Sequence, residues 1–201
     1  MSGQIICLKI LLLLMFIVAR KWTNGESEVP QKDIRKFLNT SELIWTYNST
    51  ASSLTKCRVD KKESITGEQI VFQRSFHRLK KGDWAHVYLQ GIFSFWHWKN
   101  NKTYDTILVS RAGENMSRWK TEELLVHQDN DNRCAAFKTF TKGKSIDIFF
   151  VDIRIKNSSV HEEPSEDCLK ACNRARRRRI SYGRYSPDCQ KEVHDNKEHF
   201  V

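Results

Sequence analysis

Beyond residue 19 the sequence lacks any long hydrophobic run, which argues against a protein that spans a membrane with later segments. The run at its start, Ile5–Ala19, is interrupted by Lys9. It is also shorter than the roughly 20 apolar residues that a membrane-spanning helix needs. A short apolar run with a basic flank and small residues after it is typical of a secretory signal peptide. We therefore expect residues 1–25 to be the signal peptide, cleaved after Ala19 or near Gly25, and the product to be secreted without a membrane span.

The sequence also lacks the patterns that mark catalytic and metal sites. It has no G-x-S-x-G or P-loop motif, and Cys168-x-x-x-Cys172 lacks the partner ligands of a zinc site. The histidines show no metal-ligand spacing: His77, His86, His97, His127, His161, His194 and His199. These absences argue against an enzyme, a metal site and a bound cofactor, and nucleic acid is not a partner that we expect. They favour a binding protein.

Two further features agree with export. Removal of the signal peptide leaves an odd number of cysteines, which in an oxidising compartment predicts two disulfides and one remaining thiol: Cys57, Cys134, Cys168, Cys172 and Cys189. Five N-glycosylation sequons predict a glycoprotein, at Asn39, Asn48, Asn101, Asn115 and Asn157.

The mature chain, residues 26–201, is long enough for one domain with a sizeable core and too short for two. Short strand patterns recur along it at near-regular spacing, at 42–50, 56–61, 69–76, 84–98, 101–110, 122–128, 134–137 and 145–152. A short amphipathic helix at 31–38 precedes them, and a helix at 165–178 follows them. This order predicts an all-β fold, a closed antiparallel barrel with an N-terminal and a C-terminal helix, and not a parallel sheet with crossover helices.

Two local expectations concern the strands. Asn48 can carry a glycan, which cannot sit inside a barrel, so residues on the opposite face of its strand are expected to point inward: Leu43, Trp45 and Tyr47. The segment 84–98 is too long for one ordinary strand, and Gly91 predicts a bulge or a break within it.

Six short motifs follow one another along the mature chain: Glu42-Leu43-Ile44-Trp45, Cys57-Arg58-Val59-Asp60, Asn132-Arg133-Cys134-Ala135-Ala136-Phe137, Asp147-Ile148-Phe149-Phe150-Val151-Asp152, Asp167-Cys168-Leu169-Lys170 and Asp188-Cys189. Their order resembles the salivary lipocalins of ticks, the histamine-binding-protein family. The resemblance spans nearly the whole mature chain. It implies an eight-stranded lipocalin (calycin) barrel, a monomer secreted into saliva, and disulfides Cys57–Cys189 and Cys134–Cys168, with Cys172 left over.

The same resemblance implies that the barrel sequesters a small host mediator of inflammation or haemostasis, with histamine or serotonin as the first choice. A monoamine needs carboxylates for its ammonium and aromatic faces for its ring. The ligand-binding residues expected on this basis are Glu42, Trp45, Tyr47, Tyr104, Asp147 and Phe149. Amine-binding relatives often carry an acid directly after the cysteine equivalent to Cys134, where this chain has Ala135.

Two alternatives stay open. Other members of the family hold a leukotriene or a related lipid, whose carboxylate could here meet Arg58, Arg74, His86 or Arg111. The sign of the buried charge distinguishes the two ligand classes, because paired carboxylates favour an amine and a buried Arg or His favours an acidic lipid. The basic patch could instead bind heparan sulfate or another anionic surface, or only complement the negative end of its helix: Arg174, Arg176, Arg177, Arg178 and Arg179.

Overall fold

The computed structural model describes residues 32–96, 103–146 and 148–195. The chain divides into Met1–Gln31 and Lys32–Val201, and the described residues all belong to the second unit. The expected signal peptide, the sequon at Asn101 and the expected ligand residue Asp147 lie outside the described residues.

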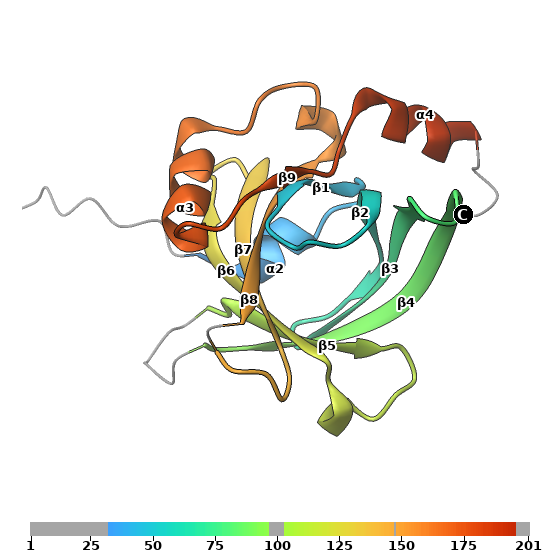
Figure 1. Ribbon diagram of the computed structural model, residues 1–201. Helices are drawn as coiled ribbons and strands as arrows, with labels where there is room; N and C mark the ends of the chain where they lie inside the picture. Colours follow the sequence, from blue (N-terminus) through green and yellow to red (C-terminus); the bar gives the residue numbers. More distant parts are fainter. Residues whose placement is uncertain (1–31, 97–102, 147, 196–201) are drawn as a thin grey trace, which may run out of the picture. The chain divides into compact units, whose positions relative to one another are not determined.

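Eight strands close into an antiparallel barrel (Figure 1): β1 (Ile44–Ser49), β2 (Thr55–Ile65), β3 (Gln69–Arg78), β4 (Asp83–Ser94), β5 (Thr106–Arg111), β6 (Thr121–Gln128), β7 (Cys134–Thr141) and β8 (Phe149–Lys156). Each strand pairs with the next along the chain, and β1 pairs with both β2 and β8, which closes the barrel. The two-residue strand β9 (Tyr182–Gly183) pairs with the end of β1. The all-β barrel expected from the spacing of the strand patterns is confirmed.

The helices are α2 (Ile34–Leu38), α3 (Glu166–Arg176), α4 (Pro187–Asp195) and the 3₁₀ turns η1 (Met116–Arg118) and η2 (Asn157–Ser159). Ser165 caps α3 by accepting a hydrogen bond from the Cys168 N–H. Acidic residues in the first turn of α3 and basic residues in its last turn complement the helix dipole. Among the described residues, no helix is long and apolar enough to cross a membrane.

The loops divide between the two ends of the barrel, because successive strands run in opposite directions. Helix α2 lies at the end that carries the β2–β3, β4–β5 and β6–β7 loops, and it buries Ile34, Phe37 and Leu38 in the inner core. We call this the closed end. The β1–β2, β3–β4, β5–β6 and β7–β8 loops surround the other end, which we call the open end.

Apolar side chains form one cluster on each face of the barrel wall. The inner cluster joins α2 to side chains from opposite strands, among them Ile44, Phe72, Ile107 and Phe137. The outer cluster lies between β7, β8, β1 and β2 and the helices α3 and α4. Two disulfides cross this outer layer, Cys57–Cys189 and Cys134–Cys168, and they are the two that the resemblance implies. Cys172 is free and buried in the same layer.

The orientation expected for the first strand is wrong. Ile44 lies in the inner cluster, whereas Trp45 lies in the outer cluster and is fully buried there. Its ring meets that of Tyr185 edge to face, with 5.3 Å between the ring centroids. The C-terminal segment covers the outside of β1 (Figure 1), so apolar residues on both faces of this strand are buried and alternation alone does not show which face points inward.

Gly91 does not interrupt its strand either. The β3–β4 pairing continues in register through Gly91, which stands opposite Ile70. A Cβ atom at position 91 would lie 3.3 Å from the Ile70 Cγ2 atom. The glycine therefore permits a close side-chain approach inside the barrel and makes no bulge.

Candidate functional site

Six charged side chains meet inside the barrel, between its two ends. They come from β2, β3, β6 and β8, and we call them the charged layer: Arg58, Asp60, Arg74, Glu123, Asp152 and Arg154. The contact of Arg74 on β3 with Glu123 on β6 passes through the interior, because these strands are three positions apart in the wall. The layer therefore spans the lumen.

Arg74 lies at the centre of the charged layer. Its Nε and Nη2 atoms donate to the two carboxylate oxygens of Asp60, each at 2.8 Å, and its Nη1 atom donates to Glu123 Oε1 at 2.9 Å. Two-pronged contacts of this kind fix the guanidinium plane as well as its charge. Arg74 thereby holds strands β2, β3 and β6 together from inside.

Arg154 and Arg58 complete the layer. Arg154 Nη2 lies 2.6 Å from Glu123 Oε2 and 3.4 Å from Asp152 Oδ2. Arg58 Nη2 donates to Asp152, and Arg58 Nε donates to the Thr46 hydroxyl at 2.8 Å. Every carboxylate of the layer therefore has a guanidinium partner.

These contacts control the charge states. Burial alone would raise the pKa of Glu123, but Arg154 and Arg74 beside it hold that pKa far below the usual range of a glutamate. Arg58 and Arg154 likewise overcome burial and lower the pKa of Asp152. Both carboxylates are ionised at neutral pH, so three guanidiniums face three carboxylates and the charged layer is balanced.

The charges are not equally accessible. The side chains of Arg58 and Arg74 are each 15% exposed, whereas those of Glu123 and Asp152 are 1% and 0% exposed. Asp60 is 9% exposed, so the two arginines are the most accessible of these five charged groups.

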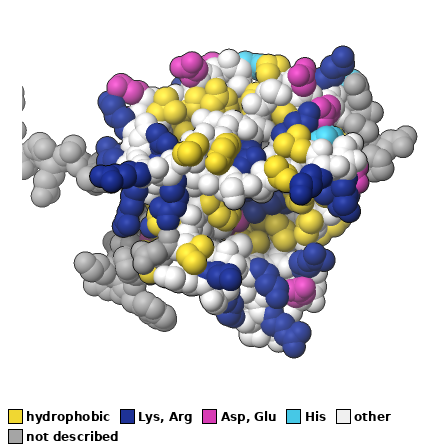
Figure 2. All heavy atoms as spheres, viewed as in Figure 1, with side chains coloured by type: hydrophobic (Ala, Val, Ile, Leu, Met, Phe, Trp, Pro, Cys, Tyr) yellow, Lys and Arg dark blue, Asp and Glu magenta, His cyan; other side chains and the backbone are white. Residues whose placement is uncertain are grey.

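Apolar side chains line the inner face of the barrel between the charged layer and the open end. Phe76 follows Arg74 on the inner face of β3, Val87 stands opposite Arg74 on β4, and Phe150 precedes Asp152 on the inner face of β8; all three are half-buried. Thr139 stands opposite Phe150, and its hydroxyl is buried without a hydrogen-bond partner among the described residues. Figure 2 shows a recess with hydrophobic side chains in the middle of the visible face, with Lys and Arg side chains around it.

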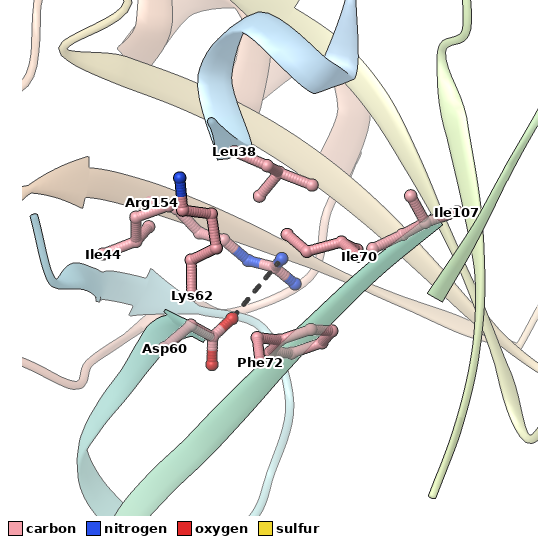
Figure 3. A pocket seen from close by; sticks show the side chains of 8 residues that line it. All are labelled: Leu38, Ile44, Asp60, Lys62, Ile70, Phe72, Ile107 and Arg154. Carbon is pink, nitrogen blue, oxygen red and sulfur yellow. Dashed lines mark ion pairs between the residues drawn. The ribbon is translucent and has the colours of Figure 1, made fainter. Parts of the chain in front are cut away.

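A second, smaller cavity lies on the closed side of the layer (Figure 3). It is lined by Leu38, Ile44, Asp60, Lys62, Ile70, Phe72, Ile107 and Arg154. Its free volume for a water-sized molecule is about 10 Å³, roughly the room of one water. Lys62 stands at its rim and donates to the Asn39 side chain at 2.8 Å. This cavity is therefore too small for an amine or a lipid ligand, and the inner face toward the open end is the candidate site.

Comparison with solved structures agrees with this architecture. The chain is similar to a protein solved as the AM182 serotonin complex, with a TM-score of 0.55, 12% identity, and coverage of 79% of this chain and 93% of that one. It is also similar to the siderocalin Ex-FABP, with a TM-score of 0.50, 7% identity, and coverage of 73% and 93%. The fold is that of a lipocalin.

A third lipocalin-type structure, japanin from Rhipicephalus appendiculatus bound to cholesterol, matches with a TM-score of 0.48, 8% identity, and coverage of 73% and 95%. No protein-family model matches the sequence, and no curated protein matches it. At these identities the similarity shows the lipocalin fold alone, and the likeness to the histamine-binding proteins of ticks stays a resemblance.

The ligand residues expected on the first strand lie outside the lumen of this lipocalin barrel. Glu42 accepts a hydrogen bond from the Ser158 N–H at 2.7 Å, which lowers the pKa of Glu42 and holds η2 against the start of β1. Trp45 Nε1 donates to the Asn157 side chain at 2.8 Å, and Tyr47 stacks on Tyr185 with 6.3 Å between ring centroids. These residues attach the C-terminal segment to the barrel.

Tyr104 and Phe149, the remaining expected ligand residues that the structure describes, are also separated. Tyr104 lies at the closed end, where the Arg35 guanidinium stands 4.8 Å from its ring centroid. Phe149 lies on the outer face beneath Lys138 and Arg179, each 3.7 Å from its ring centroid. The structure therefore does not bring the expected set together around one ligand.

The sequons differ in their surroundings. Asn39 and Asn115 are exposed, and Asn48 is half-buried on β1 beside β9. The Asn157 side-chain oxygen accepts hydrogen bonds from Trp45 and from Gln190, so this side chain is part of the contact between η2 and α4.

Sequence reasoning missed four members of the charged layer: Asp60, Glu123, Asp152 and Arg154. A signal for two of them was present in β8, where Asp152 and Arg154 alternate with buried Val151, Ile153 and Ile155. Charged residues at every second position of an otherwise apolar strand indicate a polar inner face when the outer face is also covered.

Proposed function

We propose that this protein is a secreted lipocalin that binds and sequesters one small, mostly apolar molecule with an acidic head group, such as a fatty acid or a leukotriene, in the open side of its barrel. One observation carries this proposal: Arg58 and Arg74 are the more exposed members of the charged layer, whereas Glu123 and Asp152 are almost fully buried. The half-buried Phe76, Val87 and Phe150 supply an apolar wall for the rest of the ligand.

An acidic head group can bind without breaking the charged layer. A guanidinium has five N–H donors, and Arg58 bonds the protein through Nε and Nη2, while its Nη1 makes no hydrogen bond within the described part of the chain. The unpartnered Thr139 hydroxyl offers a further donor on the same inner face. An ammonium group would have to reach Asp152 Oδ1, which has no hydrogen-bond partner in the described part of the chain but belongs to a fully buried side chain. Otherwise it would have to displace an arginine from its carboxylate, and leaving a buried charge unpaired costs about 3–5 kcal/mol.

Calorimetric titration tests the proposal directly. The purified protein is titrated with arachidonic acid, leukotriene C4, histamine and serotonin, and with the methyl ester of arachidonic acid. We expect one-to-one binding of the acids, and at least tenfold weaker binding of the ester, because it cannot accept a charge-assisted hydrogen bond.

Two variants separate the open side from the closed side. Arg58→Gln is expected to weaken binding of the acids at least tenfold, and Lys62→Met, which also removes one positive charge from the inner face, is expected to leave it unchanged. Equal loss in both variants would contradict an open-side site. No heat with any of the compounds would overturn small-molecule binding by this barrel.

A biogenic amine, histamine or serotonin, is the second candidate, and the similarity in fold to a structure solved with serotonin favours it. For this candidate the ammonium must either reach the unpartnered but buried Asp152 Oδ1 or displace a guanidinium from a carboxylate of the charged layer, within the part of the chain that the structure describes. Heat with serotonin or histamine and none with the acids would establish it in place of the first.

The setting that we propose for either ligand is saliva at a feeding site, where a monomeric, glycosylated carrier would remove a host mediator and so suppress inflammation and haemostasis. The sequons, the two disulfides and the apolar start of the sequence support secretion. Recovery of the protein from the culture medium of insect cells, with glycan mass on peptides that contain Asn39 or Asn115, would test it.

A further inference from the structure

The loops around the open end combine exposed aliphatic and basic side chains. Leu54 in the β1–β2 loop is 53% exposed, Leu79 in the β3–β4 loop 51%, and Ile146 and Ile148 in the β7–β8 loop 61% and 59%. Exposed lysines or arginines accompany three of these loops, at Lys80, Lys81, Arg118, Lys120, Lys142 and Lys144.

The basic patch, which covers the last turn of α3 and the residues after it, belongs to the same end of the barrel. Arg179 lies 3.7 Å from the ring centroid of Phe149, the first residue of β8, and β8 begins at the open end. Arg177 and Arg178 are exposed, and Ile180 directly after the patch is 69% exposed. The patch therefore extends the ring of basic and aliphatic residues along the side of the β7–β8 loop.

Acidic residues gather at the opposite end. Asp129, Glu162 and Glu163 line a surface hollow beside the Cys134–Cys168 disulfide, near the β6–β7 loop. Asp131, in that loop, and Glu166 and Asp167, in the first turn of α3, continue this acidic surface. Arg133 lines the same hollow and pairs with Asp131 and Glu162, so this surface is mixed in charge. The open end is the more basic of the two ends, and an anionic surface would attract the barrel with that end first.

We propose that the open end docks on an anionic lipid membrane, with its lysines and arginines over the phospholipid head groups and its exposed leucine and isoleucine side chains in the interface. Each basic residue near an anionic leaflet contributes an attraction that changes partitioning about fivefold. Aliphatic side chains at loop tips add favourable burial in lipid, which a sulfated polysaccharide does not offer. The aliphatic residues among the lysines therefore favour a membrane over heparan sulfate as the partner.

Sedimentation with vesicles tests this proposal and needs no ligand. The protein is mixed with vesicles of phosphatidylcholine alone or with about one-third phosphatidylserine. We expect binding only to the anionic vesicles and a marked loss at higher salt. Lys80→Glu/Lys144→Glu, which alters two different loops, is expected to weaken this binding by roughly 30-fold or more.

A matched charge change serves as the control. Lys36→Glu/Lys170→Glu makes the same change in net charge at exposed sites on α2 and α3, away from the open end, and is expected to leave vesicle binding nearly unchanged. Equal loss in both double variants would show attraction by net charge alone and would contradict docking by the open end.

Removal of the aliphatic tips separates membrane from polysaccharide. Leu79→Ser/Ile146→Ser is expected to weaken vesicle binding at least fivefold and to leave elution from heparin unchanged. Absence of binding to anionic vesicles would overturn the proposal. Vesicle binding that this variant does not alter, together with heparin retention lost in Arg177→Ala/Arg178→Ala, would assign the surface to sulfated polysaccharide instead.

Discussion

At the scale of single residues, Glu123 shows how strongly the charged layer depends on complete pairing. It accepts hydrogen bonds from Arg74 and lies 2.6 Å from Arg154, and its side chain is 1% exposed. Because both arginines are buried with it, the carboxylate offsets charge that water cannot reach. A substitution at this position therefore changes stability mainly because it leaves the Arg74 and Arg154 guanidiniums buried without this carboxylate.

Glu123→Gln keeps the size of the side chain and removes its charge. We expect it to lower the free energy of unfolding by about 3–5 kcal/mol, because Arg74 and Arg154 then stay buried with too few carboxylates. Urea unfolding followed by tryptophan fluorescence measures this difference. Asp83→Asn, which removes the exposed partner of Arg78, is the control and is expected to have little effect. A similar small effect in both variants would contradict the importance of the layer.

The same carboxylates predict how stability depends on pH. The pKa values of Glu123 and Asp152 are lowered in the folded protein. Their contribution is therefore fully present above the pKa of an unfolded carboxyl group, about 4, and is lost as the pH falls below it toward the folded values. Unfolding midpoints measured from pH 7 to pH 2 should decrease once the pH is below about 4. A midpoint that stays constant in that range would contradict a contribution of these carboxylates to stability.

Cys172 is the unpaired cysteine of the described residues, and burial governs its chemistry. Burial raises the pKa of this thiol to about 11, and its side chain is on the buried face of α3. We expect no reaction with a thiol reagent at pH 8 in the folded protein and one equivalent after unfolding, because the thiolate is the reacting form. Fast reaction of the folded protein would show that α3 opens or that the disulfides exchange.

At the scale of elements, two disulfides attach the C-terminal helices to the barrel. Cys57–Cys189 joins β2 to α4 across 132 residues, and Cys134–Cys168 joins β7 to α3 across 34. The model of chain entropy gives roughly 5 and 4 kcal/mol for loops of these sizes. We expect Cys57→Ser/Cys189→Ser to lower the midpoint of thermal unfolding more than Cys134→Ser/Cys168→Ser. The reverse order would mean that packing of α3 outweighs loop length.

The elements also show how far pattern reading reaches. Eight strands, the N-terminal helix and the helix that carries Cys168 follow from spacing, because alternation, turn residues and capping act over a few residues. The start of β8 does not follow from spacing, because Ile146 and Ile148 continue the apolar pattern into a loop. Helix α4 does not follow from it either, because α4 depends on its disulfide and on contacts with η2.

At the scale of the whole barrel, charge is balanced in the interior and unevenly distributed over the surface. The charged layer holds three guanidiniums and three carboxylates, whereas on the surface of the described residues exposed lysines and arginines gather at the open end and at the end of α3. The paired charges hold the strands together, and Arg58 and Arg74 keep part of their surface exposed. The outer asymmetry would orient the molecule before any ligand is bound.

The amino-acid sequence by itself determined the barrel, the two candidate cysteine pairings suggested by resemblance, and the excess of basic residues near the C-terminus. Only the tertiary structure decided which face of each strand is the lumen. Trp45 was predicted to point inward because apolar alternation is the same on a covered outer face as on an inner one, and Phe149, predicted as an aromatic face for the ligand, also lies in the outer cluster. The charged layer joins residues from β2, β3, β6 and β8, and pairing over such distances along the chain depends on barrel closure, which no local pattern encodes.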